Sequence, residues 1–400
     1  MKKVVVVGGG FSGLVTAYYL SRQGFSVDLH EASPKLGGLL QTERTSSGLV
    51  ENAANGFIFN EDLAELLADL KLEYIRPLKG AKKRFIFRKR LKRWPLTIFE
   101  SLKLFFKVIP RMIFRRASLK PQAQETMWAW GLRNFTRGLT KYLLAPVLQG
   151  IYAGNVEQMS AELIIGPYFK RKNPKTKRGY RGTISFQNGM GEFIAALERK
   201  LRQEGVRIYL NSVYEPEDLT IPHVICVSAA VAPRVVRKVS AELASSLSRI
   251  EVLPVLSATL FFKEPQAKIV GFGALFPEDQ NFRVLGVLSN AYIFENRGPA
   301  YSETWIFGGA HSPEMVAKSP DEILARIQME RKRILGVEDR YFDYRMNPSP
   351  QALPHYTLEH KKILEELKLP KNLYLNGNYM GGIGLSKILS RSKELVHEIT

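Results

Sequence analysis

The chain has 400 residues, of which 45% are hydrophobic, so it is long enough for two or three domains with substantial cores. Its 58 Lys and Arg outnumber 38 Asp and Glu, and the formal charge of +20 predicts an acidic partner: nucleic acid, anionic lipid or an anionic substrate. No apolar stretch has the length of about 18 residues that a transmembrane helix needs. A single cysteine, Cys226, excludes an internal disulfide and is typical of a reducing compartment.

The first residues carry the most specific motif of the chain. Val4 to Val7 predict a buried parallel strand, which leaves no room before it for a secretory signal. The strand runs into a G-x-G-x-x-G turn, and a helix to Arg22 follows. In such a turn Gly8 permits the tight bend, Gly10 lets the backbone approach a pyrophosphate and Gly13 lets helix and strand pack closely.

This turn predicts a dinucleotide site, because the N-terminus of the helix, with Ser12, offers free N–H groups to phosphates. A second strand ends at Glu31, 18 residues beyond Gly13, where an acid can accept a hydrogen bond from a ribose hydroxyl. The acid disfavours NADP, because it would repel a 2′-phosphate, and it leaves NAD and FAD open. The alternative is a glycine-rich turn in an ordinary βαβ unit.

The loop after Glu31 separates NAD from FAD. Ala32 opens this loop, and the pair Gly37 and Gly38 closes it. The pattern resembles FAD-containing amine oxidases and their relatives, in which the loop passes over the cofactor. Leu39 stands where those relatives often have Arg. The resemblance implies FAD as the cofactor.

The middle of the chain is basic and rich in aromatic residues. Within 82–95, Phe85, Phe87 and Leu91 alternate with charged residues, which predicts a strand in a hairpin. Ile98 to Phe114 then predicts a helix with a large apolar surface edged by Lys and Arg. Such a helix either packs on a core or lies in a bilayer interface. The same composition fits RNA binding, but no nucleic-acid motif accompanies it, so we expect no nucleic-acid partner.

The rest of the chain alternates helices and strands. We expect helices near 62–70, 128–148, 192–203 and 321–335, and strands near 183–186, 206–210, 224–227, 257–262, 283–288, 304–307 and 373–376. Residues 170–181 predict a polar, basic loop. Val213, between two returning strands, is predicted to contact the cofactor. A second strand–turn–helix unit can aim another helix N-terminus at it through Gly377, Asn378, Gly382, Ile383, Gly384 and Leu385.

Taken in order, several blocks resemble the oxygen-dependent protoporphyrinogen oxidase family of amine-oxidase-like flavoproteins. The blocks are the N-terminal fingerprint and 83–86, 150–154, 271–277, 285–288, 354–357 and 377–385. The resemblance implies an α/β fold in three parts. These are a Rossmann-like FAD-binding domain (1–77, 183–235 and 367–400), a mixed-sheet substrate domain (78–92, 168–182 and 236–366) and a helical membrane-docking part (93–167).

The family also implies the substrate site. By motif position, Arg84 looks like the arginine that meets a substrate propionate, and Gly150 looks like the small residue on the face of the macrocycle. Leu275, Leu288 and Ile306 look like apolar pocket walls.

Two further positions depart from the family pattern. Asn55 stands where Arg is usual, and His355 stands where Gln is common. Both departures bear on the positioning of flavin and substrate.

The residues show no Ser-His-Asp set, metal-ligand spacing or paired carboxylates. We therefore predict no metal and no catalytic side chain, because the flavin would carry the chemistry. The resemblance implies oxidation of protoporphyrinogen IX to protoporphyrin IX in haem biosynthesis, with O2 reduced to H2O2. A coproporphyrinogen III oxidase of the same fold, an amine oxidase or desaturase, and a non-catalytic flavin-fold carrier stay open.

The resemblance implies a cytoplasmic enzyme attached peripherally to the inner face of the cell membrane, with the anionic membrane surface as a partner. It leaves open a homodimer and a contact with the next enzyme of haem synthesis.

Overall fold

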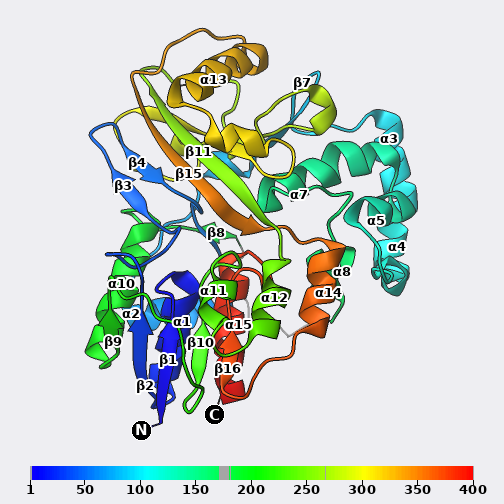
Figure 1. Cartoon of the computed structure of the whole chain (residues 1–400). Helices are drawn as coiled ribbons and strands as arrows, with labels where there is room; N and C mark the ends of the chain where they lie inside the picture. The colour runs from blue at the N-terminus through cyan, green and yellow to red at the C-terminus, as the bar shows by residue number, and fades with distance from the viewer. Residues whose placement is uncertain (1, 171–179, 181, 266, 400) are drawn as a thin grey trace.

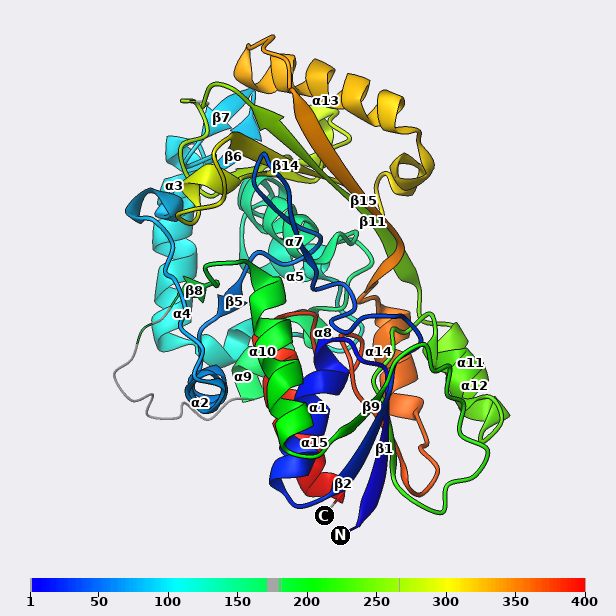
Figure 2. The ribbon, with the colours of Figure 1, turned by 90° about the vertical axis from the view of Figure 1, so that its left-hand side faces the viewer.

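The computed structural model describes residues 2–170, 180, 182–265 and 267–399. Two β-sheets occupy opposite ends of the molecule, and both chain termini lie at the end that holds the first sheet (Figures 1 and 2). The predicted basic loop 170–181 lies outside the described residues, except for Lys170 and Tyr180.

The first sheet is entirely parallel and has the order β16-β10-β1-β2-β9. Its strands come from three separate stretches of sequence: β1 (Lys3–Val7), β2 (Ser26–His30), β9 (Arg207–Tyr209), β10 (His223–Ile225) and β16 (Leu373–Leu375). Parallel neighbours need crossover connections, so helices cover both faces of this sheet.

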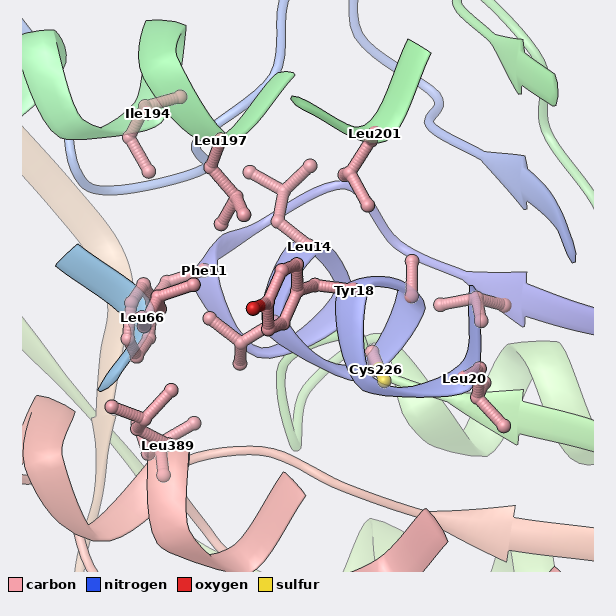
Figure 3. Close-up of a cluster of buried hydrophobic side chains, with 14 of the residues drawn as sticks. Phe11, Leu14, Tyr18, Leu20, Leu66, Ile194, Leu197, Leu201, Cys226 and Leu389 are labelled. Atoms are coloured by element: carbon pink, nitrogen blue, oxygen red, sulfur yellow. The ribbon is translucent and has the colours of Figure 1, made fainter. Parts of the chain in front are cut away.

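The alternating side chains of β1 show how the two faces are buried. Val4 and Val6 pack in one core, beneath α1 (Phe11–Arg22), α2 (Glu61–Leu70), α10 (Met190–Gln203) and α15 (Leu385–Ile399). Figure 3 shows the centre of this core, where α1 meets α10 and α15. Val5 and Val7 pack on the opposite side with α11 (Ala232–Val236), α12 (Ala241–Ser248) and α14 (Leu358–Glu366).

The second sheet has seven strands in the order β15-β11-β14-β13-β12-β6-β7. It is mixed, because β12 and β6 run parallel while the other pairs are antiparallel. The strands are β6 (Arg84–Arg88), β7 (Arg90–Lys92), β11 (Val252–Phe262), β12 (Gly273–Leu275), β13 (Gly286–Ser289), β14 (Tyr301–Gly308) and β15 (Asp343–Pro354). One face packs against α13 (Pro320–Leu335) around the buried Trp305.

A helical region lies beside the other face of this sheet (Figure 1). Its helices are α3 (Ile98–Lys103), α4 (Ile109–Phe114), α5 (Met127–Asn134), α6 (Arg137–Leu139), α7 (Ala145–Tyr152), α8 (Ala161–Ile164) and α9 (Gly166–Lys170). The short pairs β3 (Thr42–Arg44) with β4 (Leu49–Glu51) and β5 (Phe57–Ile58) with β8 (Thr183–Ile184) complete the fold. Within the described residues, no helix is long and apolar enough to cross a membrane.

One predicted helix is wrong. The sequence predicts a single helix over 128–148, but the chain is extended at Phe135, where φ is −118° and ψ is −168°. Thr136 then starts a new helix, because its side chain accepts a hydrogen bond from the Leu139 N–H. The break matters for the site, because it sets α7 on a course of its own between the two sheets.

Candidate functional site

A cavity of about 1740 Å³ lies between the two sheets. The parallel sheet contributes the carboxyl ends of β1 and β2, and the mixed sheet contributes one face. Ligands of open parallel sheets bind at this end of the strands. The cavity is therefore the candidate site.

The three glycines of the first turn differ in what a side chain at each position would meet. Gly8 has φ +105°, and a Cβ atom there would lie 2.9 Å from the Cys226 carbonyl oxygen. A Cβ atom on Gly13 would lie 1.8 Å from the Gly8 carbonyl oxygen, so helix and strand could not pack as they do. A Cβ atom on Gly10 would meet nothing nearer than the Gly38 Cα at 4.0 Å, which leaves the cavity floor open.

The N-terminus of α1 faces this floor and is free to bind an anion. No side chain caps it, and its first turn holds no acidic residue. Ser12 lines the cavity, but its hydroxyl donates to the Cys226 carbonyl oxygen at 3.1 Å. Gly37 and Gly38 also line the cavity, and the Gly37 N–H donates to the Gly9 carbonyl oxygen at 2.8 Å. This arrangement fits a pyrophosphate.

Glu31 holds a fixed carboxylate at the edge of the same cavity. Its Oε2 accepts from the Gly9 N–H at 2.6 Å, and its Oε1 accepts from the Ser33 N–H at 2.8 Å. Ala32 and Val213 line the cavity beside it. Two hydrogen bonds from backbone N–H groups leave lone pairs free on a carboxylate, so Glu31 is suited to accept further hydrogen bonds from ribose hydroxyls.

The second glycine turn lies at the opposite end of the cavity floor. The residues of this turn that line the cavity are Gly377, Asn378, Ile383, Gly384 and Leu385; Gly382 does not line it. His360 holds the turn from behind, since its Nε2–H donates to the Tyr379 carbonyl oxygen at 2.9 Å. Tyr356 adds a bond from its hydroxyl to the Asn378 carbonyl oxygen.

The mixed sheet forms an apolar wall above this floor. Leu288 and Ile306 line the cavity, as does Gly150 on α7. Leu275 does not line it, because its side chain packs across Gly150. A Cβ atom on Gly150 would lie 2.5 Å from the Leu275 Cδ2. Gly150 is thus required by packing between α7 and β12, in addition to any role toward a ligand.

Arg84 lies at the far edge of the same wall. It does not line the cavity and is exposed, with its guanidinium 4.9 Å from the centre of the Phe272 ring. Strand register pairs Arg84 with Gly273, Gly273 with Leu288, and Leu288 with Thr304. Directly paired residues point to the same face of a sheet, so Arg84 shares the face of Leu288 and stands at its rim.

The two departures from the family pattern lie outside the cavity lining. Asn55 is half-buried and does not contact the cavity, although its neighbours do. His355 is buried: Nδ1 lies 2.7 Å from Glu251 Oε2, and Nε2 accepts from the Asn155 N–H at 3.1 Å. A Cβ atom on Gly154 would lie 2.9 Å from the His355 ring, so His355 supports the turn after α7.

Sequence reasoning missed a polar wall formed by β15. Asn347, Ser349 and Gln351 line the cavity at every second position, as one face of a strand should. The intervening Pro348 and Pro350 obscured the strand. Proline is tolerated here because β15 is an edge strand, and the period of two was the available signal.

The sequence analysis also did not assign two other polar residues to the site. Asn52 lines the cavity, and its Oδ1 is buried without a partner among the described residues. Cys226 lies beneath the turn, and burial raises the pKa of its thiol to about 12. The described residues contain no group of three His, Cys, Asp or Glu that could hold a metal ion.

An open glycine floor, an uncapped helix N-terminus, a fixed carboxylate and a second glycine turn define a dinucleotide-binding protein of the flavoprotein type. The family model described as flavin containing amine oxidoreductase matches residues 11–215 and 220–384. The chain belongs to the flavin-containing amine oxidoreductase family, and its cofactor is FAD. The prediction of FAD is confirmed.

Similar proteins carry porphyrin-related names. Protoporphyrinogen oxidase 2 of Arabidopsis thaliana is 24% identical, over 97% of this chain and 92% of that protein. Coproporphyrinogen III oxidase of Bacillus subtilis is 21% identical, over 99% and 97%. A solved structure from Exiguobacterium sp., provisionally named protoporphyrinogen oxidase, superimposes with a TM-score of 0.78 at 20% identity, covering 100% of this chain and 98% of the other. At this identity, the structural likeness shows the fold alone.

Proposed function

We propose that the protein oxidises protoporphyrinogen IX to protoporphyrin IX, with O2 as the electron acceptor and H2O2 as the product. The observation that carries the proposal is the continuous cavity, in which an FAD site meets an apolar wall with an arginine at its rim. An apolar macrocycle with anionic propionates matches this lining and charge. When bound, FAD supplies a hydride acceptor that O2 can reoxidise.

The residues of the chain bind, orient and exclude water. Leu288 and Ile306 offer the macrocycle an apolar surface, and Gly150 also lines the cavity. Arg84 pairs with a propionate at the rim, where its planar guanidinium matches a carboxylate with two hydrogen bonds. The reacting methylene carbon is thereby held over the cofactor floor.

Coproporphyrinogen III is the second candidate substrate. It carries four carboxylates, and the polar wall of Asn347, Ser349 and Gln351 offers additional hydrogen-bond partners for them. The resemblance to the Bacillus subtilis protein supports the same alternative.

An oxidation assay separates these functions. The purified protein, with its flavin absorbance recorded, is incubated aerobically with each porphyrinogen in turn, and the porphyrin and H2O2 formed are measured. We expect the protoporphyrinogen reaction to be faster. A faster coproporphyrinogen reaction would select the second candidate. A flavin-loaded protein that oxidises neither porphyrinogen, but oxidises amines or nothing at all, would refute the proposal.

We also propose that α3 and α4 attach the enzyme peripherally to the inner face of the cell membrane. Phe99 of α3, Phe106 in residues 104–108 between the two helices and Phe114 of α4 are 78%, 71% and 82% exposed, which is unusual for large apolar side chains in water. Lys103, Arg111, Arg115 and Arg116 flank them. Basic residues near an anionic surface contribute about 1 kcal/mol each, and salt screens this attraction.

Sedimentation with vesicles of phosphatidylcholine and phosphatidylglycerol tests the attachment. We expect the wild type to sediment with the vesicles at low salt, and the triple variant Phe99→Ser/Phe106→Ser/Phe114→Ser to stay in solution. Phe342→Ser, at an exposed phenylalanine in another part of the molecule, is the matched control and should sediment like the wild type. A wild type that stays in solution would leave α3 and α4 without a membrane role.

A further inference from the structure

The face of the mixed sheet that lines the cavity contains a buried hydroxyl, that of Thr304, whose hydrogen bonds can be counted. Thr304 of β14 lies between the apolar residues Leu288 and Ile306 and lines the cavity with them. Its Oγ1 accepts from the Asn290 Nδ2 at 2.9 Å and lies 2.8 Å from the Thr259 Oγ1. The remaining question is which of the two threonine hydroxyls donates to the other.

The amide of Asn290 has a definite orientation. As it stands, both of its N–H groups are used, because Nδ2 donates to the Thr304 Oγ1 and also to the Ser302 Oγ at 3.3 Å. Only the Oδ1 is left without a partner among the described residues. Turning the amide around would give Oδ1 two donors, but it would bury two unused N–H groups, which costs more than one unused carbonyl.

Proton counting then settles the threonine pair. Thr259 is fully buried, does not line the cavity and has no other side-chain partner in the described part of the chain. If Thr304 donated to Thr259, the Thr259 proton would be buried without an acceptor. If Thr259 donates to Thr304, every proton of the pair is used except that of Thr304, which faces the cavity. Thr304 therefore presents a hydrogen-bond donor to whatever occupies the cavity.

The position of Thr304 in the sheet indicates which part of the occupant it meets. Ser257 and Ile306 form the neighbouring cross-strand row on this face, and the Ser257 hydroxyl donates to the Asn52 carbonyl oxygen at 3.2 Å, so this row lies against the loop between β4 and β5. Thr304 belongs to the next row, which ends in Arg84. Three strand spacings of about 4.8 Å separate Arg84 from Thr304, or about 14 Å.

We propose that Thr304 donates its hydroxyl proton to a second carboxylate of the substrate, while Arg84 binds the first. This inference rests on the proposed function, because it takes a porphyrinogen with at least two propionates as the ligand. Thr304 is then a substrate-binding residue, and Asn290 and Thr259 are positioning residues that force its proton toward the cavity. One cross-strand row then carries a hydrogen-bond donor at each end, Arg84 and Thr304, with Gly273 and Leu288 between them.

The test compares Thr304→Val, which keeps the shape and removes the hydroxyl, with Thr304→Ser, which keeps the hydroxyl. Both are purified with FAD and compared with the wild type for kcat/KM on the preferred porphyrinogen. Their affinity for the product porphyrin as the free acid and as the methyl ester is measured by fluorescence titration. Hydrogen bonds to charged groups predict a roughly 10- to 150-fold loss for Thr304→Val with the free acid. The loss should be much smaller with the ester, and Thr304→Ser should recover most of the affinity.

Thr140→Val is the matched control, because it makes the same substitution at a buried threonine that does not line the cavity and whose hydroxyl donates to the Thr136 carbonyl oxygen. It should bind both porphyrins as the wild type does. Equal affinity of Thr304→Val and wild type for the free acid would overturn the inference while leaving the proposed function intact. An equal loss with Thr140→Val, or with the ester, would also overturn it. A wild type that neither oxidises nor binds a porphyrin would overturn both proposals.

Discussion

The cofactor floor and the substrate wall of the cavity are built in different ways. On the floor, Gly8, Gly10 and Gly13 lie within one short turn; Gly8 and Gly13 have no room for a side chain, and Gly10 leaves open space toward the cavity. On the wall, Arg84, Leu288 and Thr304 come from strands that are far apart in the sequence and meet only through sheet register. The floor is thus a local motif, whereas the wall is a product of the tertiary fold.

This difference predicts how each region responds to a single substitution. A backbone turn binds its ligand through N–H groups and empty space, so a single added side chain removes the site. A wall of side chains binds its ligand through many small contacts, so each single substitution there removes only part of the affinity. The three predictions below probe this contrast.

Substitution at Gly10 and Gly13 should have the largest effects, with different outcomes. Gly13→Val should prevent folding, because its Cβ atom would overlap the Gly8 carbonyl oxygen at 1.8 Å. Gly10→Val should fold, since Gly10 has φ −70° and open space beside it, but it should purify without FAD. Soluble yield, circular dichroism and flavin absorbance measure the two outcomes.

Gly80→Ala is the control for these variants, because a Cβ atom there meets nothing within 4 Å and Gly80 lies away from the cavity. It should fold and bind FAD normally. A Gly10→Val protein that retains a full complement of FAD would show that the pyrophosphate lies elsewhere and that the floor is assigned wrongly.

The sequence could predict the floor because its information is contiguous. The strand, the glycine spacing and Glu31 lie within one βαβ unit, and FAD follows from them and the family resemblance. The wall was predicted only by motif position, and Asn290, Thr259 and Thr304 were not found. Their hydrogen bonds depend on which residues of β11 and β14 pair, and side-chain periodicity alone does not fix that register.

Acid should lower the free energy of unfolding through His360, which supports the second glycine turn. Burial lowers the pKa of His360 from 6.5 to about 4. Between these values the unfolded chain binds a proton and the folded chain does not, so the free energy of unfolding falls as the pH is lowered through this window. The full loss is about 3 kcal/mol and is complete near pH 4. Denaturant titrations at about pH 7 and about pH 4 measure it.

His360→Gln keeps an N–H donor for the Tyr379 carbonyl oxygen but cannot titrate, so its stability should depend less on pH by about this 3 kcal/mol. Tyr356→Phe, which removes the other side-chain hydrogen bond to this turn, is the matched control and should retain the wild-type pH dependence, because a tyrosine does not titrate between about pH 4 and about pH 7. Identical pH dependence of the wild type and His360→Gln would show that the acid response of the molecule comes from other groups.

Substitution of Arg84 should have the smallest of the three effects, and it tests the wall. Its exposure and its stacking on Phe272 leave the guanidinium free to grip a carboxylate with two parallel hydrogen bonds, which lysine cannot copy. A charged hydrogen bond contributes about 1.5–3 kcal/mol, so Arg84→Ala should lower kcat/KM on the preferred porphyrinogen roughly 10- to 150-fold. FAD content should be unchanged, because Arg84 does not line the cofactor floor. Arg84→Lys should recover only part of the loss.

Lys82→Ala and Arg90→Ala remove exposed charges close by in the sequence and should have little effect. If all three alanine variants lose activity equally, Arg84 acts only as part of a general positive field and the rim holds no specific carboxylate site.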